Sequence, residues 1–238
     1  MRVPPPINCQ RCPAWLENIF HALPTSEVES FSRAKVIRHY KRGQALYVES
    51  SRPEGLYCIC EGQVKQVRSG PDGREQILRI SRRGEVLGFC GLFAEESYTT
   101  SAFALDDSLV CFIRGSVFFP LVKNKPDLAV EVIKRLSREA LVLEGRTAEM
   151  ALKPADQRLA ALLLRLEEFS VPRRVQGPTR LGVSLSRKEM AESIGTTAET
   201  LIRILGRLEA DGLVRLSGKD IVILDVAGLR DISRSSLS

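Results

Sequence analysis

Residues 185–214 read LSRKEMAESIGTTAETLIRILGRLEADGLV, and this stretch decides the fold of the C-terminal part of the chain. Ser186 followed by Glu189 makes a capping-box pattern, in which each side chain bonds a free backbone amide at the start of a helix. The pattern predicts a helix over residues 187–194. Gly195 is expected to end it, because glycine readily takes the left-handed conformation that closes many helices.

A second, amphipathic helix follows in the same stretch. Thr196 or Thr197 is placed to cap it, and we expect it to continue to about residue 210, where an Asp-Gly pair ends it. Its apolar side chains recur at helical spacing and predict one buried face, made of Leu201, Ile204, Leu205 and Leu208. Two such helices joined by a tight turn are typical of the helix-turn-helix, whose second helix enters the DNA major groove.

Glu199, Ile202 and Arg203 lie opposite that buried face, in the first two turns of the second helix. A carboxylate accepts a hydrogen bond from the cytosine amino group, an arginine bonds O6 and N7 of guanine, and an isoleucine offers apolar surface to a thymine methyl. The next segment, LVRLSGKDIVILD, predicts two short strands forming the wing of a winged helix. Helix-turn-helix pairs also occur as packing motifs, but the wing and these exposed side chains favour a helix that reads DNA.

The composition allows two domains with a sizeable core, since 44% of the 238 residues are hydrophobic and 27% are charged. We find no uncharged apolar run of about 18 residues and no signal-peptide core, so we expect a cytoplasmic protein with no membrane partner. The formal net charge of +6 divides equally, +3 each, between residues 152–238 and the rest. DNA binding is therefore inferred from the placement of basic residues and not from the total charge.

Short segments punctuated by glycine occupy residues 36–113. Pro71 and Gly73 predict a turn in the sequence PDG, because proline presets φ and glycine tolerates a positive φ. Strand-like runs stand between the turns, namely LYCIC, QVKQV, EQILRI and SLVCFI. Short strands at this spacing predict an antiparallel β-roll or barrel.

A long helix is predicted over residues 126–151, with Pro126 in its first turn. Apolar or small side chains alternate at spacings of three and four, as in a coiled-coil seam: Ile133, Leu136, Ala140, Leu143, Thr147 and Met150. Gly145 interrupts this pattern. The helix could pack on its own domain, but a seam between two domains favours a dimer interface.

These features, in this order, resemble those of the Crp/Fnr family of transcription regulators, named for the cyclic-AMP receptor protein and the fumarate–nitrate reduction regulator. The segments KRGQALYVES, GLYCICEGQVK and GEVLGFCGLF resemble the glycine-marked turns of the family's cyclic-nucleotide-binding β-roll, and ALDDSLVCFI resembles its last strand. TTAETLIRILGRLEADGLV resembles the recognition helix of the family. The resemblance runs from about Pro24 to Asp225 and is closer to the fumarate–nitrate type.

The resemblance implies an α+β chain in four parts. They are an N-terminal cysteine-containing segment and helix (1–23), a sensory β-roll (24–125), a dimerisation helix (126–151) and a winged-helix DNA-binding domain (152–238). It also implies a homodimer on a near-palindromic site with half-sites ~34 Å apart, and RNA polymerase as a partner if the protein activates transcription.

Glu199 and Arg203 match the family pair that recognises a TGA-type core, so the expected site is of the form TTGA…TCAA. Ala198 stands where the cyclic-AMP receptor type has a further arginine, and Ile202 stands where the fumarate–nitrate type usually has serine. Arg207, one turn further along, is expected to contact phosphate. Ser186 and Thr197 complete the predicted set of DNA-binding residues.

Two departures argue against cyclic AMP as the effector. Phe89 stands where the resemblance predicts the glutamate that holds the ribose, and Thr100 stands where it predicts the arginine that neutralises the cyclic phosphate. A buried phosphate without that arginine would be an uncompensated charge. We therefore expect no response to cyclic AMP; a cyclic-nucleotide responder is the rival within this family.

Cysteines are confined to the first half of the chain. Cys9 and Cys12 form a C-x-x-C pair, and Cys111 falls where oxygen-sensing members of the family place one ligand of an iron–sulfur cluster. Those members have a third N-terminal cysteine that is absent here, so Cys90 is the expected fourth ligand. Zinc on the same four cysteines is an alternative.

Other roles for these residue types remain open. Cys58, Cys60 and Cys111 read as small core residues of the strands, which is where free cysteine usually lies. Cys9 and Cys12 could instead form a thiol–disulfide switch, or serve a thiol oxidoreductase, the rival from a different class. His21 and His39 are the candidate axial ligands if the protein bound haem. We find no catalytic triad, phosphate loop or carboxylate pair, and we expect no enzyme.

Overall fold

The computed structural model describes residues 9–169, 178–183 and 185–234. The chain forms two compact units. The first takes the chain up to Gly73 together with Leu78–Val142, and the second takes Arg74–Ile77 together with the chain from Leu143 onward. The division between the units therefore falls inside the long helix α4 (Pro126–Leu152).

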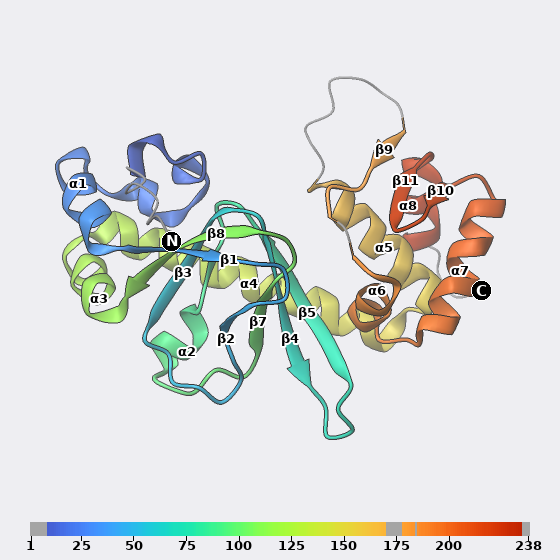
Figure 1. Cartoon of the computed structure of the whole chain (residues 1–238), viewed down its shortest axis with the longest axis horizontal. Coiled ribbons are helices and arrows are strands. Elements are labelled where there is room, and N and C mark those ends of the chain that lie inside the picture. The colour runs from blue at the N-terminus through green and yellow to red at the C-terminus, as the bar shows by residue number, and fades with distance from the viewer. Residues whose placement is uncertain (1–8, 170–177, 184, 235–238) are drawn as a thin grey trace. The chain divides into compact units, whose positions relative to one another are not determined.

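Two four-stranded sheets form the β-roll (Figure 1). One sheet has the order β1-β8-β3-β6, from Val36–Tyr40, Ser108–Arg114, Gly55–Glu61 and Val86–Leu87. The other has the order β2-β7-β4-β5, from Ala45–Tyr47, Ser101–Ala104, Gln63–Ser69 and Glu75–Arg82. The predicted β-roll is thus confirmed, and the turn predicted at PDG joins β4 to β5, with Gly73 at a φ of 75°.

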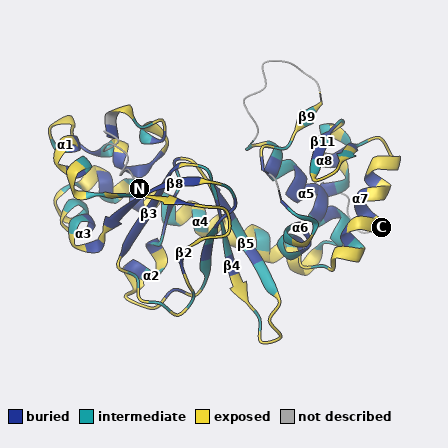
Figure 2. Ribbon diagram, viewed as in Figure 1, coloured by how far each residue is buried: buried dark blue, intermediate teal, exposed yellow. Residues whose placement is uncertain are grey.

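Strands β3 and β8 are buried on both faces, because alternate side chains point into two different cores (Figure 2). Side chains from both sheets form the inner core, to which these two strands contribute Tyr57, Ile59, Val110 and Phe112. The outer core lies on the other face of β3 and β8. To it they contribute Leu56, Cys58, Cys60, Leu109, Cys111 and Ile113.

Helical segments from both ends of the first unit cover the outer core. The N-terminal ones are the short 3-10 helices η1 (Cys9–Arg11), η2 (Trp15–Glu17) and η3 (Ile19–Ala22), followed by α1 (Thr25–Ala34). Helix α3 (Gly115–Asn124) and the start of α4 follow the last strand. Phe20, Phe31 and Phe118 form ring contacts in this layer, which holds the N-terminal cysteines over the sheet.

Helix α4 is 27 residues long, begins at Pro126 as predicted and continues through Gly145 without a break. Leu128 and Val132 are buried in the outer core. The predicted seam is on the outside: Ile133 is 62% exposed and Leu143 is 53% exposed. Ala140, Thr147 and Met150 are exposed as well, whereas Leu136 packs partly against the outer core.

The second unit contains a small winged-helix fold. Its helices are α5 (Ala155–Glu167), α6 (Arg187–Ile194), α7 (Ala198–Ala210) and α8 (Val226–Arg234). Its three-stranded sheet has the order β10-β11-β9, from Val214–Ser217, Asp220–Ile223 and Thr179–Arg180. The helix-turn-helix and the wing predicted from residues 185–225 are therefore confirmed.

Local sequence chemistry explains the ends of α6 and α7. The Ser186 hydroxyl accepts from the Glu189 amide while the Glu189 carboxylate accepts from the Ser186 amide, so the capping box is complete. Gly195 closes α6 in the left-handed conformation. Thr197, one of the two candidates, caps α7 by accepting from the Thr200 amide.

Candidate functional site

Helix α7 presents two charged side chains that form no ion pair or side-chain hydrogen bond with another described residue. Leu201, Ile204, Leu205 and Leu208 are buried, as predicted from their spacing. Glu199 and Arg203 are exposed on the other side, and neither forms an ion pair with a described residue. Ile202 lies between them and is 57% exposed. An exposed acid and guanidinium with an apolar neighbour fit hydrogen bonding to base edges better than they fit packing.

Ser186 and Thr197 act locally as helix caps. The Ser186 hydroxyl both accepts from the Glu189 amide and donates to the Glu189 carboxylate. Thr197 Oγ1 accepts from the Thr200 amide at 3.2 Å and lies 3.1 Å from the Thr200 hydroxyl. Their first role is therefore to fix the starts of the two helices, and contact with DNA stays a prediction for both.

Arg207 is placed differently from Arg203. Its guanidinium pairs with Asp156 at the start of α5, at 3.6 Å. Both side chains remain well exposed, so this pair is weak and a phosphate group could replace it. Lys188 on α6 is also exposed and pairs only loosely with Glu192, at 3.6 Å.

The wing is tied to the helix-turn-helix by hydrogen bonds on both sides. The Glu209 carboxylate of α7 accepts from the Leu216 amide of β10 at 2.7 Å. The Arg187 guanidinium donates to the carbonyl of Gly218, in the turn between β10 and β11. These bonds hold the wing in a fixed position beside the exposed face of α7.

Arg158 of α5 links the end of α4 to the turn of the helix-turn-helix. Its guanidinium donates to the Lys153 carbonyl at 2.7 Å and to the Ile194 carbonyl at 2.8 Å. These carbonyls lie at the ends of α4 and α6, where backbone acceptors have no partner within their own helix. The guanidinium of one side chain therefore links the turn to the end of α4 through hydrogen bonds.

The β-roll holds a cavity of about 130 Å³. This is smaller than the ~300–1,000 Å³ of typical ligand pockets. Its lining includes the carboxylates Glu96 and Glu139, and no Lys or Arg among the described residues. Phe89 and Thr100, which replace the expected glutamate and arginine, both line it. The cavity therefore offers a cyclic phosphate neither space nor a counter-charge.

Tyrosine side chains fill much of this region. The rings of Tyr47 and Tyr98 stack with centroids 4.0 Å apart, and Tyr57 lies 5.5 Å from Tyr47. The Tyr47 hydroxyl accepts from Gln66 Nε2 at 2.8 Å. Burial, partly offset by hydrogen bonds to Thr100 and Gln66, raises the pKa of Tyr47 to about 12, so the hydroxyl stays neutral.

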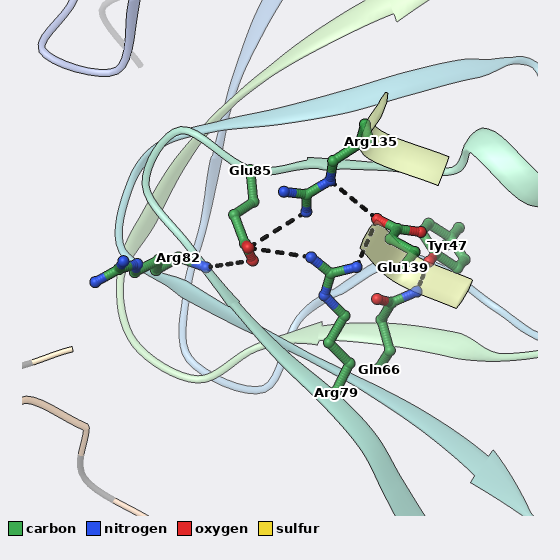
Figure 3. Close-up of polar contacts among 7 residues, drawn as sticks. All are labelled: Tyr47, Gln66, Arg79, Arg82, Glu85, Arg135 and Glu139. Carbon is green, nitrogen blue, oxygen red and sulfur yellow. Dashed lines mark hydrogen bonds and ion pairs between the residues drawn. The ribbon is translucent and has the colours of Figure 1, made fainter. Parts of the chain in front are cut away.

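A four-membered ion-pair network joins the β-roll to α4 beside this cavity (Figure 3). Arg79 of β5 bonds Glu139 at 2.5 Å and Glu85 at 3.0 Å. Arg135 of α4 bonds Glu139 at 3.1 Å and lies 3.3 Å from Glu85. Burial alone would raise the pKa of Glu85, but the charges of Arg79 and Arg135 outweigh it and lower that pKa. Glu85 is therefore held as a carboxylate, and the network sets two acidic side chains against two guanidinium groups.

A group of cysteine side chains lies in the outer core, on the outer face of the sheet β1-β8-β3-β6. Cys60 Sγ lies 3.1 Å from Cys111 Sγ and also shares a hydrogen bond with Cys12. Cys9 Sγ accepts from Lys35 Nζ at 2.9 Å. We call Cys9, Cys12, Cys60 and Cys111 the sulfur cluster; Cys58 is buried in the same core.

Proton sharing sets the charge of this sulfur cluster. The hydrogen bond from Cys60 lowers the pKa of Cys12 to about 6, and it lowers the pKa of Cys111 as well. The hydrogen bonds to Cys111 and Cys12, together with burial, raise the pKa of Cys60 itself. Burial lowers the pKa of Lys35, but the neighbouring Cys111 and Cys9 raise it overall. The arrangement favours Cys12 as thiolate and Cys60 as thiol.

Cys90 was the expected fourth metal ligand, and the structure places it elsewhere. It is exposed on the short helix α2 (Phe89–Ala94) and lines the cavity. Cys60 is a buried core residue of β3, as predicted, and it also lies beside Cys12 and Cys111. The register of β3 and β8 pairs Cys58 with Cys111 and brings Cys60 close by, whereas Cys90 lies away from these sulfurs.

The sulfur cluster does not fit an iron–sulfur cluster or zinc as its side chains lie. Across residues 9–169, 178–183 and 185–234, no group of three or more His, Cys, Asp or Glu side chains is arranged to hold a metal ion. Sulfurs bound to one zinc stand about 3.8 Å apart, from Zn–S bonds of ~2.3 Å, and Cys60 and Cys111 are closer than that. Lys35 also already supplies positive charge at Cys9.

His21 and His39, the candidate haem ligands, are both exposed. His21 lies on η3, where its ring nitrogen bonds the Asn18 carbonyl, and His39 lies on β1. A haem role stays a prediction without support from their positions. In the described part of the chain, no helix has the length and hydropathy needed to span a bilayer.

Sequence reasoning missed three of these features: the ion-pair network, the partnership of Cys60 with Cys12, and the two-helix contact of Arg158. Each includes a contact between residues far apart in the chain: Arg79 with Glu139, Cys12 with Cys60, and Arg158 with Ile194. The single available hint was the pair of cysteines in LYCIC, since alternate residues of a strand share one face.

Two family models match the chain, one in each unit. The model for a cyclic nucleotide-binding domain matches residues 37–125. The model for a Crp-like helix-turn-helix domain matches residues 157–232. The two matches together span the β-roll and the winged helix.

Similar proteins include bacterial regulators of the same length. The transcriptional regulatory protein btr of Bordetella pertussis is 27% identical, over 96% of this chain and 94% of that protein. The fumarate and nitrate reduction regulatory protein of Vibrio cholerae is 28% identical, over 95% of this chain and 90% of its own. FixK2 of Bradyrhizobium japonicum has a similar fold, with a TM-score of 0.75 at 24% identity, covering 85% of this chain and 99% of that one.

The ion-pair network is expected to stabilise the first unit. Glu139→Gln removes the charge that pairs with Arg79 and Arg135 and leaves both guanidinium groups partly buried. We expect the free energy of unfolding to fall by about 2–3 kcal/mol, below the full cost of breaking a buried pair because these side chains keep some exposure. Urea denaturation of the parent chain and the variant measures this change in the free energy of unfolding.

Glu144→Gln is the matched control, since Glu144 is exposed on the same helix and forms no ion pair with a described residue. It should change the unfolding free energy by less than about 0.5 kcal/mol. Equal unfolding midpoints for the two variants would show that the network contributes nothing.

Proposed function

The chain belongs to the Crp/Fnr family of transcription regulators, and on that basis we propose that it binds a near-palindromic TTGA-type DNA site as a homodimer. It has the DNA-binding helix-turn-helix of that family. The observation that carries the proposal is the exposed couple of Glu199 and Arg203 on α7, which form no ion pair within the part of the chain that the structure describes. Their charged groups are free to meet base edges because the other side of the helix supplies all of its packing.

Each side chain has a proposed partner in the half-site. Arg203 bonds O6 and N7 of the guanine, and Glu199 accepts from a cytosine amino group. Ile202 has no donor or acceptor, so it favours an apolar contact with a thymine methyl at the outer position. Arg207 and Lys188 contact phosphates, with Ser186 and Thr197 at the helix starts completing the surface.

The dimer forms along the exposed seam of α4. A continuous line of exposed apolar or small side chains on a helix is costly in water unless a partner covers it. The seam runs over five turns, and α4 carries further exposed apolar residues, including Leu141 and Leu152. A second copy of the same helix is the partner that a two-fold DNA site requires.

Cyclic AMP is not the proposed effector. The cavity is small, it has two carboxylates in its lining, and tyrosine rings occupy its surroundings. The family's role in transcription supports a cytoplasmic location with access to DNA, and RNA polymerase as a partner if the protein activates transcription. A thiol oxidoreductase is the weaker proposal, because it would leave the helix-turn-helix without a role.

Replacing Arg203 tests the base-reading role. Arg203→Ala should weaken binding to a TTGA-type palindrome by about 1–3 kcal/mol and relax the preference at one guanine, because a bidentate contact is lost. Fluorescence anisotropy with the consensus duplex and with single-base variants measures both effects.

Lys188→Ala is the control, since Lys188 is exposed on α6 and is assigned to phosphate. It should weaken all duplexes alike and reduce the salt dependence of binding. An Arg203→Ala variant that loses the same affinity for consensus and random DNA would contradict base reading.

A charge in the seam should separate the subunits. Ile133→Glu places a carboxylate on the proposed interface, so light scattering at micromolar concentration should give the mass of one chain, 26.5 kDa, in place of two. Val142→Glu is the control. Val142 is exposed like Ile133, at 53% against 62%, but lies half a turn round the helix from it. If Ile133→Glu remains dimeric, the seam is not the interface.

Cyclic AMP should leave the protein's melting temperature unchanged. A ligand at a hundredfold excess over its Kd stabilises a folded protein by about 2.7 kcal/mol, which a thermal shift detects easily. A rise in Tm with cyclic AMP, absent with adenosine, would show that the cavity opens to admit the nucleotide.

A further inference from the structure

Cysteine side chains from three separate parts of the chain meet over the outer face of β3 and β8. We propose that Cys12 and Cys60 are a peroxide-reactive pair that forms a reversible disulfide when a hydroperoxide oxidises Cys12. This inference rests on the positions of the thiols and is independent of the proposed DNA binding.

The two sulfur atoms are already neighbours. Cys12 packs against the outer core, which contains both Cys60 and Cys111. Cys60 shares a hydrogen bond with Cys12, and its sulfur lies 3.1 Å from that of Cys111. A backbone bond from the Cys12 amide to the Cys9 carbonyl, 3.0 Å long, closes the η1 turn that carries both cysteines. The Cys9 amide is held in turn by the Ser32 hydroxyl of α1 at 3.1 Å. The pair is therefore preorganised from both sides.

Exposure assigns a different role to each thiol. Cys12 is partly exposed, whereas Cys9, Cys60 and Cys111 are all buried. A small oxidant from solvent therefore reaches Cys12 first. The Lys35 ammonium, which donates to Cys9, adds positive charge to the sulfur cluster and favours a thiolate there.

The reaction balances without a metal. In the first step the Cys12 thiolate attacks the terminal oxygen of the hydroperoxide: an S–O bond forms, the O–O bond breaks, and alkoxide or hydroxide leaves. Sulfur loses two electrons, the peroxide gains them, and Cys12 becomes a sulfenic acid. In the second step Cys60 sulfur attacks Cys12 sulfur: an S–S bond forms, the S–O bond breaks, and the hydroxyl leaves as water with the Cys60 proton. A dithiol reductant reverses the modification.

The disulfide would fasten the N-terminal segment to the sheet. Cys12 lies between η1 and η2, and Cys60 lies on β3 at an irregularity in its pairing with β8. The bond would thus join a segment held over the sheet by side-chain packing to a central strand of the β-roll.

Peptide mapping tests the proposal on the full-length chain. The protein, purified without oxygen and reduced, is treated with cumene hydroperoxide, blocked with iodoacetamide and digested with trypsin. Cleavage after Arg11 separates Cys9 from Cys12, so a link from residues 12–33 to the peptide containing Cys58 and Cys60 identifies the partner strand. The Cys58→Ser variant then shows which of these two cysteines is joined. We expect the Cys12–Cys60 link, and its loss with dithiothreitol.

Variants separate the roles of the two thiols. Cys60→Ser should abolish the link and leave Cys12 as a sulfenic acid that dimedone traps, whereas Cys90→Ser should form the link as the parent chain does, because Cys90 lies outside the sulfur cluster. Circular dichroism confirms that each variant is folded. A Cys9–Cys12 link, no link in the folded parent chain, or bound iron and sulfide in the protein purified without oxygen would overturn the proposal.

Discussion

Double-sided burial of strands β3 and β8 is the constraint on which the first unit depends. The two strands form the centre of one sheet, with the tyrosine-rich core on one face and the helical layer on the other. Every buried side chain on them must therefore be apolar, small or internally bonded, and only the last residue of each strand is exposed. Cysteine meets this condition at Cys58, Cys60 and Cys111, because it packs as a small apolar residue while keeping a reactive sulfur. The same requirement that builds the core thus brings thiols together.

The cavity of the β-roll is lined by acidic and neutral side chains among the described residues. The cavity is small, and the nearest fixed charges are satisfied within the protein. Arg79 and Arg135 are neutralised by Glu85 and Glu139, so no unpaired cation is offered to an anionic ligand there. In this chain ion pairs between side chains of the β-roll and side chains of α4 attach the helix to the sheet. This attachment requires no bound phosphate group.

The winged helix depends on contacts of a different kind. The buried leucine face of α7 sets its position, the capping box sets the start of α6, and Arg158 fixes the turn to the end of α4 through backbone carbonyls. Because these contacts use only one side of α7, Glu199 and Arg203 on the other side remain free for recognition. Stability and DNA reading are thus assigned to opposite faces of one helix.

The sequence by itself determined the elements whose causes are local: the capping box, Gly195, a threonine cap at the start of α7, the buried face of α7, the wing and the start of α4 at Pro126. Capping and periodicity act within a few residues, so they can be read directly from the chain. Tertiary structure decided that Cys60 and not Cys90 lies beside Cys12, that Arg79 meets Glu139, and that Arg207 pairs with Asp156. Those partners are brought together by strand register and helix packing, and a shift of one residue in a strand would turn Cys60 to the other face.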